Sequence, residues 1–151
     1  MAGKSDTLEF ALLQFIFGAI PTNFAVGATA GSTSLWLGLF TADPTDAGST
    51  ANEGGYAAYT RAKTDRSTAT STGWAISSGT GAALPVASPV TTVSFPQNTA
   101  TSTGTFTHAA VYTSSNVSAS GMLYFGAITP TINFAQNVTP SLTSGSSITE
   151  E

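Results

Sequence analysis

The fold class of this chain is indicated first by the stretch TSLWLGLFT, residues 33–41. In an extended strand, alternate side chains lie on opposite faces, so Leu35, Leu37 and Leu39 share one face while Trp36 and Phe40 share the other. A strand that is apolar on both faces is buried on both faces. We therefore expect residues 33–41 to form an interior strand, either central in a sheet or beneath the N-terminal segment.

Further short segments rich in β-branched and aromatic residues follow this strand, and turn residues or prolines separate them. Together they predict an all-β fold, with a β-sandwich or jelly-roll-like domain over residues 33–151. The strands we expect after the first are Tyr56–Lys63, Trp74–Ser77, Val90–Phe95, Thr105–Thr113, Gly121–Ile128 and Thr131–Phe134.

The first 32 residues predict a short helix followed by an arm, which we treat as a separate N-terminal unit. Asp6 is a good N-cap, and Glu9 three residues later completes a capping box. Apolar side chains then recur at helical spacing until Gly18 and Pro21 end the helix, which predicts a helix over residues 6–17. This helix either packs on its own domain or docks on a neighbouring protein.

The composition is apolar enough for a folded core but unusually poor in charge. Of 151 residues, 41% are hydrophobic and only 8% are charged, whereas 45 carry a Ser or Thr hydroxyl. Residues 67–149 contain no Lys, Arg, Asp or Glu. A free monomer usually has a surface of mixed charge. Such a neutral surface favours a protein that packs against copies of itself or against a larger assembly.

Charge and hydropathy also exclude several classes of partner. With four basic residues and a net charge of −4, the chain lacks the cations that phosphate contacts require, so we expect no nucleic-acid binding. The longest apolar stretch, residues 10–20, is too short to span a bilayer and contains Gln14, so we expect no membrane association. We find no export signal and expect a cytosolic product.

We find no arrangement of residues that is typical of a catalytic or metal site, and we expect neither enzyme activity nor a cofactor. His108 lies on the strand face that we assign to Phe106, Ala110 and Tyr112, where a hydrogen-bonded structural histidine is favoured. The acidic loop Asp43–Glu53 lacks the ligand spacing of an EF-hand, which favours a solvated turn over a calcium site. The aromatic residues are expected in the core and interfaces rather than stacked on sugars.

The stretch LWLGLFTADPTDAGS, residues 35–49, followed by EGGYA, residues 53–57, resembles a family of small phage virion proteins often labelled tail-fibre proteins. The match continues in order through VSFP at residues 93–96 and GMLYFGA at residues 121–127. The family usually has an arginine soon after the Gly-Gly-Tyr-Ala element, whereas here three residues precede Arg61. The closing Gly-Asp turn of the family is replaced by Gln136-Asn137, so the last strands are the least certain part of the match.

The resemblance implies a virion structural protein. We favour a capsid decoration (cement) protein, located on the capsid surface, that forms a homotrimer and binds the major capsid protein. The alternative is a tail-associated fibre protein that contacts tail proteins or host glycans. In either case, we expect the interface to include Leu8, Leu12, Phe15, Ile16, Trp36 and Phe40.

Overall fold

The computed structural model describes residues 13, 16–17, 34–45, 49–65, 73–77, 86–112, 114–117 and 122–149 of the chain. In this part of the chain it contains nine β-strands, which confirms the predicted all-β fold. No helix among the described residues is long and apolar enough to cross a membrane.

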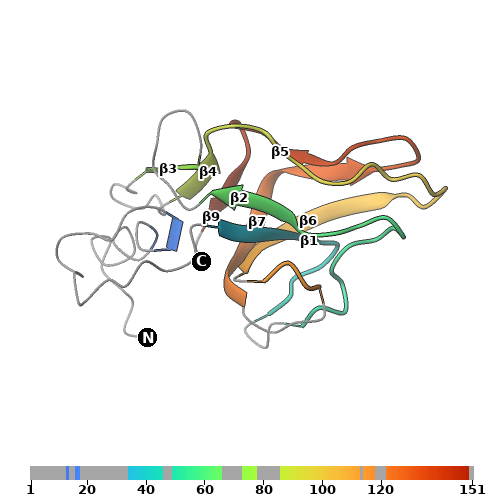
Figure 1. Ribbon diagram of the computed structural model, residues 1–151, viewed down its shortest axis with the longest axis horizontal. Helices are drawn as coiled ribbons and strands as arrows, with labels where there is room; N and C mark the ends of the chain where they lie inside the picture. Colours follow the sequence, from blue (N-terminus) through green and yellow to red (C-terminus); the bar gives the residue numbers. More distant parts are fainter. Residues whose placement is uncertain are drawn as a thin grey trace.

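Seven strands form one curled antiparallel sheet in the order β2-β1-β6-β7-β9-β4-β3, and β5 pairs with β8 in a second, two-stranded sheet (Figure 1). The long strands β6 and β7 lie side by side and form the centre of the larger sheet. The jelly-roll topology stays a prediction. The strand bounds are β1 Ser34–Phe40, β2 Ala62–Asp65, β3 Trp74–Ser77, β4 Val86–Pro89, β5 Val93–Ser94, β6 Gly104–Tyr112, β7 Met122–Phe134, β8 Ser141–Leu142 and β9 Ser147–Thr149.

Strand β1 is an interior strand between β2 and β6, as the alternation of its side chains predicts. Leu35, Leu37 and Leu39 are buried in the main hydrophobic core on one face of the sheet. On the opposite face, Phe40 is fully buried in a second, smaller cluster, and Trp36 packs against that cluster. The leucine face of this strand is therefore buried as predicted, whereas the opposite face is buried at Phe40 and only half-buried at Trp36.

The described residues of the predicted N-terminal helix pack on the chain's own core. Leu13, Ile16 and Phe17 have helical backbone, and Leu13 and Phe17 are fully buried. The ring of Phe17 lies 4.4 Å from that of Trp74, measured between centroids. Of the two alternatives for this helix, the structure supports packing on its own domain for these three residues.

A register shift in β6 moves its side chains from one face of the sheet to the other. Phe106 lies opposite Ile132 of β7, but His108, two residues later, lies opposite Ala127. An irregularity of this kind changes which face the following residues occupy. Phe106 consequently lies in the main core, whereas Ala110 lies in the second cluster. Our prediction that these two residues share a face is wrong.

Three other strand predictions differ from the structure. The strand predicted over Val90–Phe95 is reduced to β5, Val93–Ser94, because residues 90–91 form a bend after β4 ends at Pro89. Residues 56–60 form a turn, so strand β2 begins only at Ala62 instead of at Tyr56. The two strands predicted on either side of Pro130 form the single strand β7. Pro130 is exposed and has no register partner in β6 or β9, so its missing N–H leaves no ladder hydrogen bond unmade.

Candidate interaction surface

Three of the six residues predicted to form an interface are described by the structure. Trp36 is half-buried on the outer face of β1 and is available for contact. Ile16 is half-buried and packs against the main core. Phe40 has no exposed surface and belongs to the second cluster, so its side chain lies beneath the surface instead of on it. The other three predicted residues, Leu8, Leu12 and Phe15, lie outside the described residues.

A half-exposed apolar patch covers the second cluster. Trp36 of β1 and Met122 and Phe125 of β7 are partly buried and pack against the fully buried side chains beneath them. We call these three residues the Trp36 patch. Because strands β1, β6 and β7 are hydrogen-bonded neighbours, the patch rests on the most extensively paired part of the sheet.

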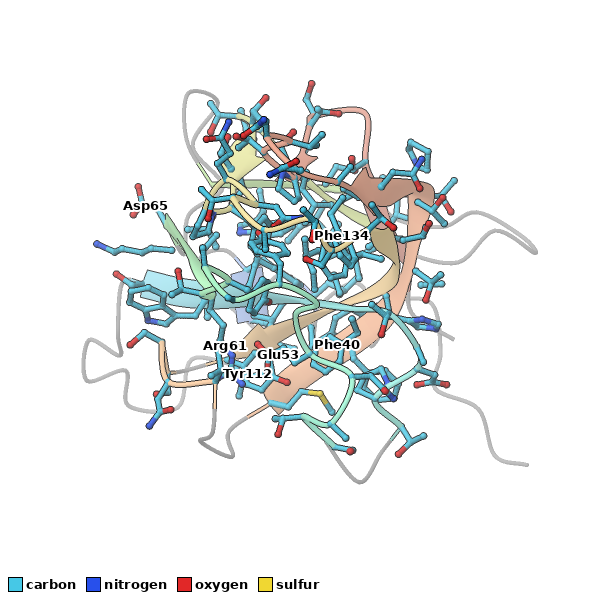
Figure 2. All side chains as sticks on the ribbon, turned by 90° about the vertical axis from the view of Figure 1, so that its right-hand side faces the viewer. Phe40, Glu53, Arg61, Asp65, Tyr112 and Phe134 are labelled. Atoms are coloured by element: carbon cyan, nitrogen blue, oxygen red, sulfur yellow. The ribbon has the colours of Figure 1, made fainter. Side chains whose placement is uncertain are left out.

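A buried ion pair lies beside this cluster. The Arg61 guanidinium donates to both carboxylate oxygens of Glu53, with Nε 2.7 Å from Oε1 and one terminal nitrogen 2.8 Å from Oε2. The two side chains are 0% and 2% exposed. The hydrogen bonds in a bidentate pair of this kind are short, and two parallel bonds fix the relative orientation of the two side chains. In Figure 2, Arg61, Glu53 and Tyr112 lie together on one side of the sheet, and Phe134 lies on the other.

Arg61 also forms hydrogen bonds with a second segment, residues 114–117. Its other terminal nitrogen donates to the carbonyl oxygen of Ser114 at 3.0 Å, and a longer contact of 3.5 Å reaches the carbonyl of Val117. The guanidinium carbon lies 3.3 Å from the centroid of the Tyr112 ring, in cation–π geometry. We call Glu53, Arg61 and Tyr112, together with Tyr59, the Arg61 cluster.

The tyrosines of this cluster are held in their protonated form. The Tyr59 hydroxyl accepts a hydrogen bond from the backbone N–H of Leu39 at 2.7 Å and lies 3.4 Å from Oε1 of Glu53. Burial, and after it the Glu53 carboxylate, raise the pKa of Tyr59 well above its usual value. The same two causes raise the pKa of Tyr112 to about 12. Both phenols therefore stay neutral in the physiological pH range.

Three glycines in the LWLGLF and EGGYA segments are required by close side-chain approaches or by the backbone conformation. A Cβ on Gly38 would lie 2.7 Å from Oε1 of Glu53, and a Cβ on Gly55 would lie 2.5 Å from Cζ of Phe134. Gly54 has a φ of 72°, a conformation that residues with a Cβ rarely adopt. The spacing of glycines in LWLGLF and EGGYA thus follows from side chains that approach the backbone closely.

A polar groove lies between β2 and the segment that contains β5. It has a cavity volume of about 220 Å³. Figure 2 shows Asp65 at the outer end of β2, beside this groove. The residues that line it are Lys63, Thr64, Asp65, Gly73, Thr91, Thr92, Val93 and Ser94.

Asp43 and His108, which the sequence analysis considered for a calcium or an acid–base site, each have a local hydrogen-bond partner. Within the described ranges, no three His, Asp or Glu side chains come close enough to form a metal site. Asp43 accepts the backbone N–H of Thr45 at 2.8 Å, which makes the start of the acidic loop a local turn. The Nδ1 atom of His108 lies 2.9 Å from the Thr107 hydroxyl, as expected of a hydrogen-bonded structural histidine.

Sequence reasoning did not identify the ion pair between Glu53 and Arg61. Both residues lie in or next to the EGGYA motif, and Arg61 is one of only four basic residues in the chain. In a chain so poor in charge, an arginine that precedes a β-strand is a usable signal for a buried pair, because a buried charge must be compensated.

Comparison with known proteins identifies a phage family. Comparison with curated proteins gives no significant match. The family described as "Podophage GP4 fiber I protein gp80" matches residues 3–149, nearly the whole chain. This match supports the resemblance to phage fibre-type proteins and, with it, a structural role in the virion. The chain belongs to the podophage GP4 fiber I protein gp80 family.

Proposed function

We propose that this chain is a non-catalytic structural component of a phage fibre. The single observation that carries the proposal is the family match over residues 3–149, because the description of that family names a fibre protein. The match spans both the described strands and the N-terminal segment, so the proposal concerns the chain as a unit.

The chain is proposed to assemble with copies of itself, most simply as a homotrimer. The Trp36 patch supports this proposal, because a half-exposed Trp beside Met and Phe has the composition of an interface core. The absence of Lys, Arg, Asp and Glu from residues 67–149 supports it as well, since charged residues are depleted at interface centres. Tyr112 links the two features, because it belongs to the second cluster under the patch and lies against the Arg61 guanidinium.

Capsid decoration is the second candidate function, and the charge-poor sequence from residue 67 to residue 149 favours it. A decoration protein stabilises a shell by binding only its assembled form, which shifts the equilibrium toward that form by mass action. Such binding needs repeated apolar and hydroxyl contacts rather than a chemical site. In this case the partners are the major capsid protein and neighbouring copies of this chain.

Copy number in the purified particle separates the two locations. We would quantify this chain against the major capsid protein by mass spectrometry of purified virions. A fibre component is expected at a small fraction of the capsid copy number. A ratio near one to one would instead establish decoration of the shell and overturn the fibre proposal. Absence from the particle would overturn both.

The homotrimer is tested with the purified chain and one pair of variants. Light scattering after size-exclusion chromatography should give three times the chain mass of 15.2 kDa. Trp36→Ser should lower this mass, because it removes the centre of the patch. Val138→Ser is the matched control, since Val138 is 39% exposed in a turn outside the patch. A monomeric wild type, or equal effects of the two substitutions, would contradict the assembly proposal.

A further inference from the structure

We propose that strand β2 pairs with the β2 strand of a second copy of this chain, antiparallel and across a two-fold axis at Thr64. Among the described strands, β2 has a single neighbour, β1, and therefore lies at one end of the larger sheet. The pairing joins the two seven-stranded sheets edge to edge. This contact differs in surface and in symmetry from the trimer contact proposed for the Trp36 patch, and it requires no other virion protein.

The side chains of β2 alternate between the interior and the surface. Ala62 and Thr64 are buried, at 7% and 8% exposure, whereas Lys63 and Asp65 are exposed. Because successive side chains of a strand lie on opposite faces, the two charged side chains share one face of the sheet. Figure 2 shows Asp65 at the margin of the molecule, away from the other labelled residues. An ammonium and a carboxylate thus lie two residues apart on the same face of the end strand.

These two charges are complementary to themselves in one antiparallel register. When Thr64 lies opposite Thr64 of the second copy, Lys63 of each copy lies directly opposite Asp65 of the other. The two-fold axis makes the two opposite-charge pairs equivalent. The Cβ atoms of directly opposed residues are about 4.5–5.5 Å apart, which is within reach of a Lys–Asp pair. The sequence of β2 therefore supplies both halves of the contact.

The neighbouring registers of the same two-fold pairing bring like charges together. A shift in one direction places Lys63 opposite Lys63 of the second copy, and a shift in the other direction places Asp65 opposite Asp65. Like charges that lie directly opposite each other destabilise a pair of strands. The charges therefore favour one register and disfavour the two beside it, which gives a short contact a defined geometry.

Charged residues on an edge strand also serve to prevent pairing with other chains. Charges of one sign suit that purpose, because they offer a second copy no attractive register. Strand β2 instead carries one charge of each sign, although exposed charge is scarce. Asp43, Lys63 and Asp65 are the exposed charged residues in the part of the chain that the structure describes, and two of these three lie on this four-residue strand. Both signs together favour pairing over protection.

The small size of the contact sets its expected strength. Stable complexes bury about 1,200–2,000 Å² of surface, far more than the pairing of two four-residue strands. We therefore expect β2 to pair at millimolar and not at micromolar concentrations of the free chain. Copies that are held together in one particle have effective concentrations in the millimolar range. The contact is thus suited to joining copies that another surface has already brought together.

The first test measures the mass of the full purified chain by analytical ultracentrifugation, in a concentration series that reaches about 1 mM. The mass should double between the lowest and the highest concentration. Lys63→Asp and Asp65→Lys each place like charges opposite each other, so each should raise the dissociation constant of the pairing at least about tenfold. The double variant Lys63→Asp/Asp65→Lys exchanges the two charges and should restore pairing. Asp43→Lys, which changes the net charge as much as Asp65→Lys does but lies outside β2, should pair as the wild type does.

The second test mixes the two single variants. Lys63→Asp has carboxylates and no ammonium at positions 63 and 65, and Asp65→Lys has the reverse, so the mixture should pair although neither variant pairs well alone. A carbodiimide, which couples a carboxylate to an amine with no spacer, should then link position 63 of one variant to position 65 of the other. Mass spectrometry of the digested mixture identifies this link. It must join two copies, because neither variant carries both groups at these positions.

Three outcomes would overturn the pairing of β2. These are a wild-type mass that does not double, a double variant that is folded by circular dichroism but does not regain pairing, and a mixture without the link between positions 63 and 65. The measurement compares two masses of the same chain, so it reads equally for a monomer and for a trimer. Its failure would therefore leave the trimer and fibre proposals unaffected, and their failure would leave this pairing to be judged by its own test.

Discussion

Replacing Arg61 by Gln removes the cation from the ion pair with Glu53 while keeping a polar side chain of moderate length. The carboxylate that remains is 2% exposed and loses two hydrogen bonds of 2.7 and 2.8 Å. The carbonyl of Ser114 loses its bond to the guanidinium as well. The substitution therefore leaves a buried charge without compensation.

Removal of one partner from a buried ion pair costs about 3–5 kcal/mol. Domains are stable by about 5–15 kcal/mol in total, so Arg61→Gln should remove a substantial share of the free energy of unfolding. The double variant, with Glu53→Gln as well, has no buried charge in this cluster. We expect it to be less destabilised than the sum of the single variants by about 1–3 kcal/mol.

Urea unfolding followed by tryptophan fluorescence measures these differences, because Trp74 is 1% exposed in the folded chain. Protein concentration is held constant, since self-association would shift the midpoint. Lys63→Gln is the matched control, because Lys63 is exposed on the adjoining strand, and a change within about 0.5 kcal/mol is expected. A loss below about 1 kcal/mol for Arg61→Gln would refute the reasoning, because that is the value of an exposed pair.

Three further predictions concern the interior. The free energy of unfolding should fall as the pH rises from about 10 to about 12. The reason is that the unfolded chain releases the Tyr112 proton near pH 10, whereas the folded chain retains it to about 12. Urea midpoints across this pH range measure the fall. Gly55→Ala should cost about 1–3 kcal/mol in thermal unfolding, since its Cβ would lie 2.5 Å from the Phe134 ring, and Phe134→Leu should relieve part of that cost. Phe17→Ala should cost about 3–5 kcal/mol in urea unfolding and change the emission of Trp74, because the two rings are 4.4 Å apart.

Each of these predictions has a matched comparison. Tyr112→Phe should reduce the loss of stability with pH, and an unchanged pH profile would contradict the role given to this phenol. Gly145→Ala should be nearly neutral, because the nearest atom to its Cβ would be 3.6 Å away, and an equal cost at both glycines would contradict the steric argument. Ile16→Ala should cost less than Phe17→Ala, since Ile16 is only half-buried. The reverse order would show that Phe17 is not a core residue.

Strand β1 could be predicted from the sequence because each of its faces has its own apolar set. Strands β8 and β9 could not, since two and three residues are too few to display an alternation. Strand β4 ends at Pro89, a residue that sequence reasoning uses as a boundary. The alternation of apolar side chains thus predicts a strand where the strand is long and apolar. It does not predict short strands whose position is set by the strands they pair with.

The face of Phe106 depends on contacts far away in the chain, whereas the pairing of Arg61 with Glu53 depends on the turn between them. The shift in β6 arises from its register with β7, which the composition of β6 alone does not encode. Glu53 begins the EGGYA motif and Arg61 follows four residues after its end, so they are close in the sequence, but their pairing depends on the turn at residues 56–60. From the sequence, Trp36 was placed on the face of β1 opposite the leucines and among the expected interface residues, whereas Met122 and Phe125 were not singled out.

The bonds of Arg61 also have a consequence for folding kinetics. The guanidinium joins residues 8 positions away at Glu53 and 53 positions away at Ser114. Closing the longer loop requires the intervening strands to be ordered first, because loop-closure entropy opposes early formation of distant contacts. We therefore expect this part of the cluster to form after the folding transition state. Its loss should mainly accelerate unfolding and leave the refolding rate nearly unchanged, so Arg61 sets how long a folded chain survives.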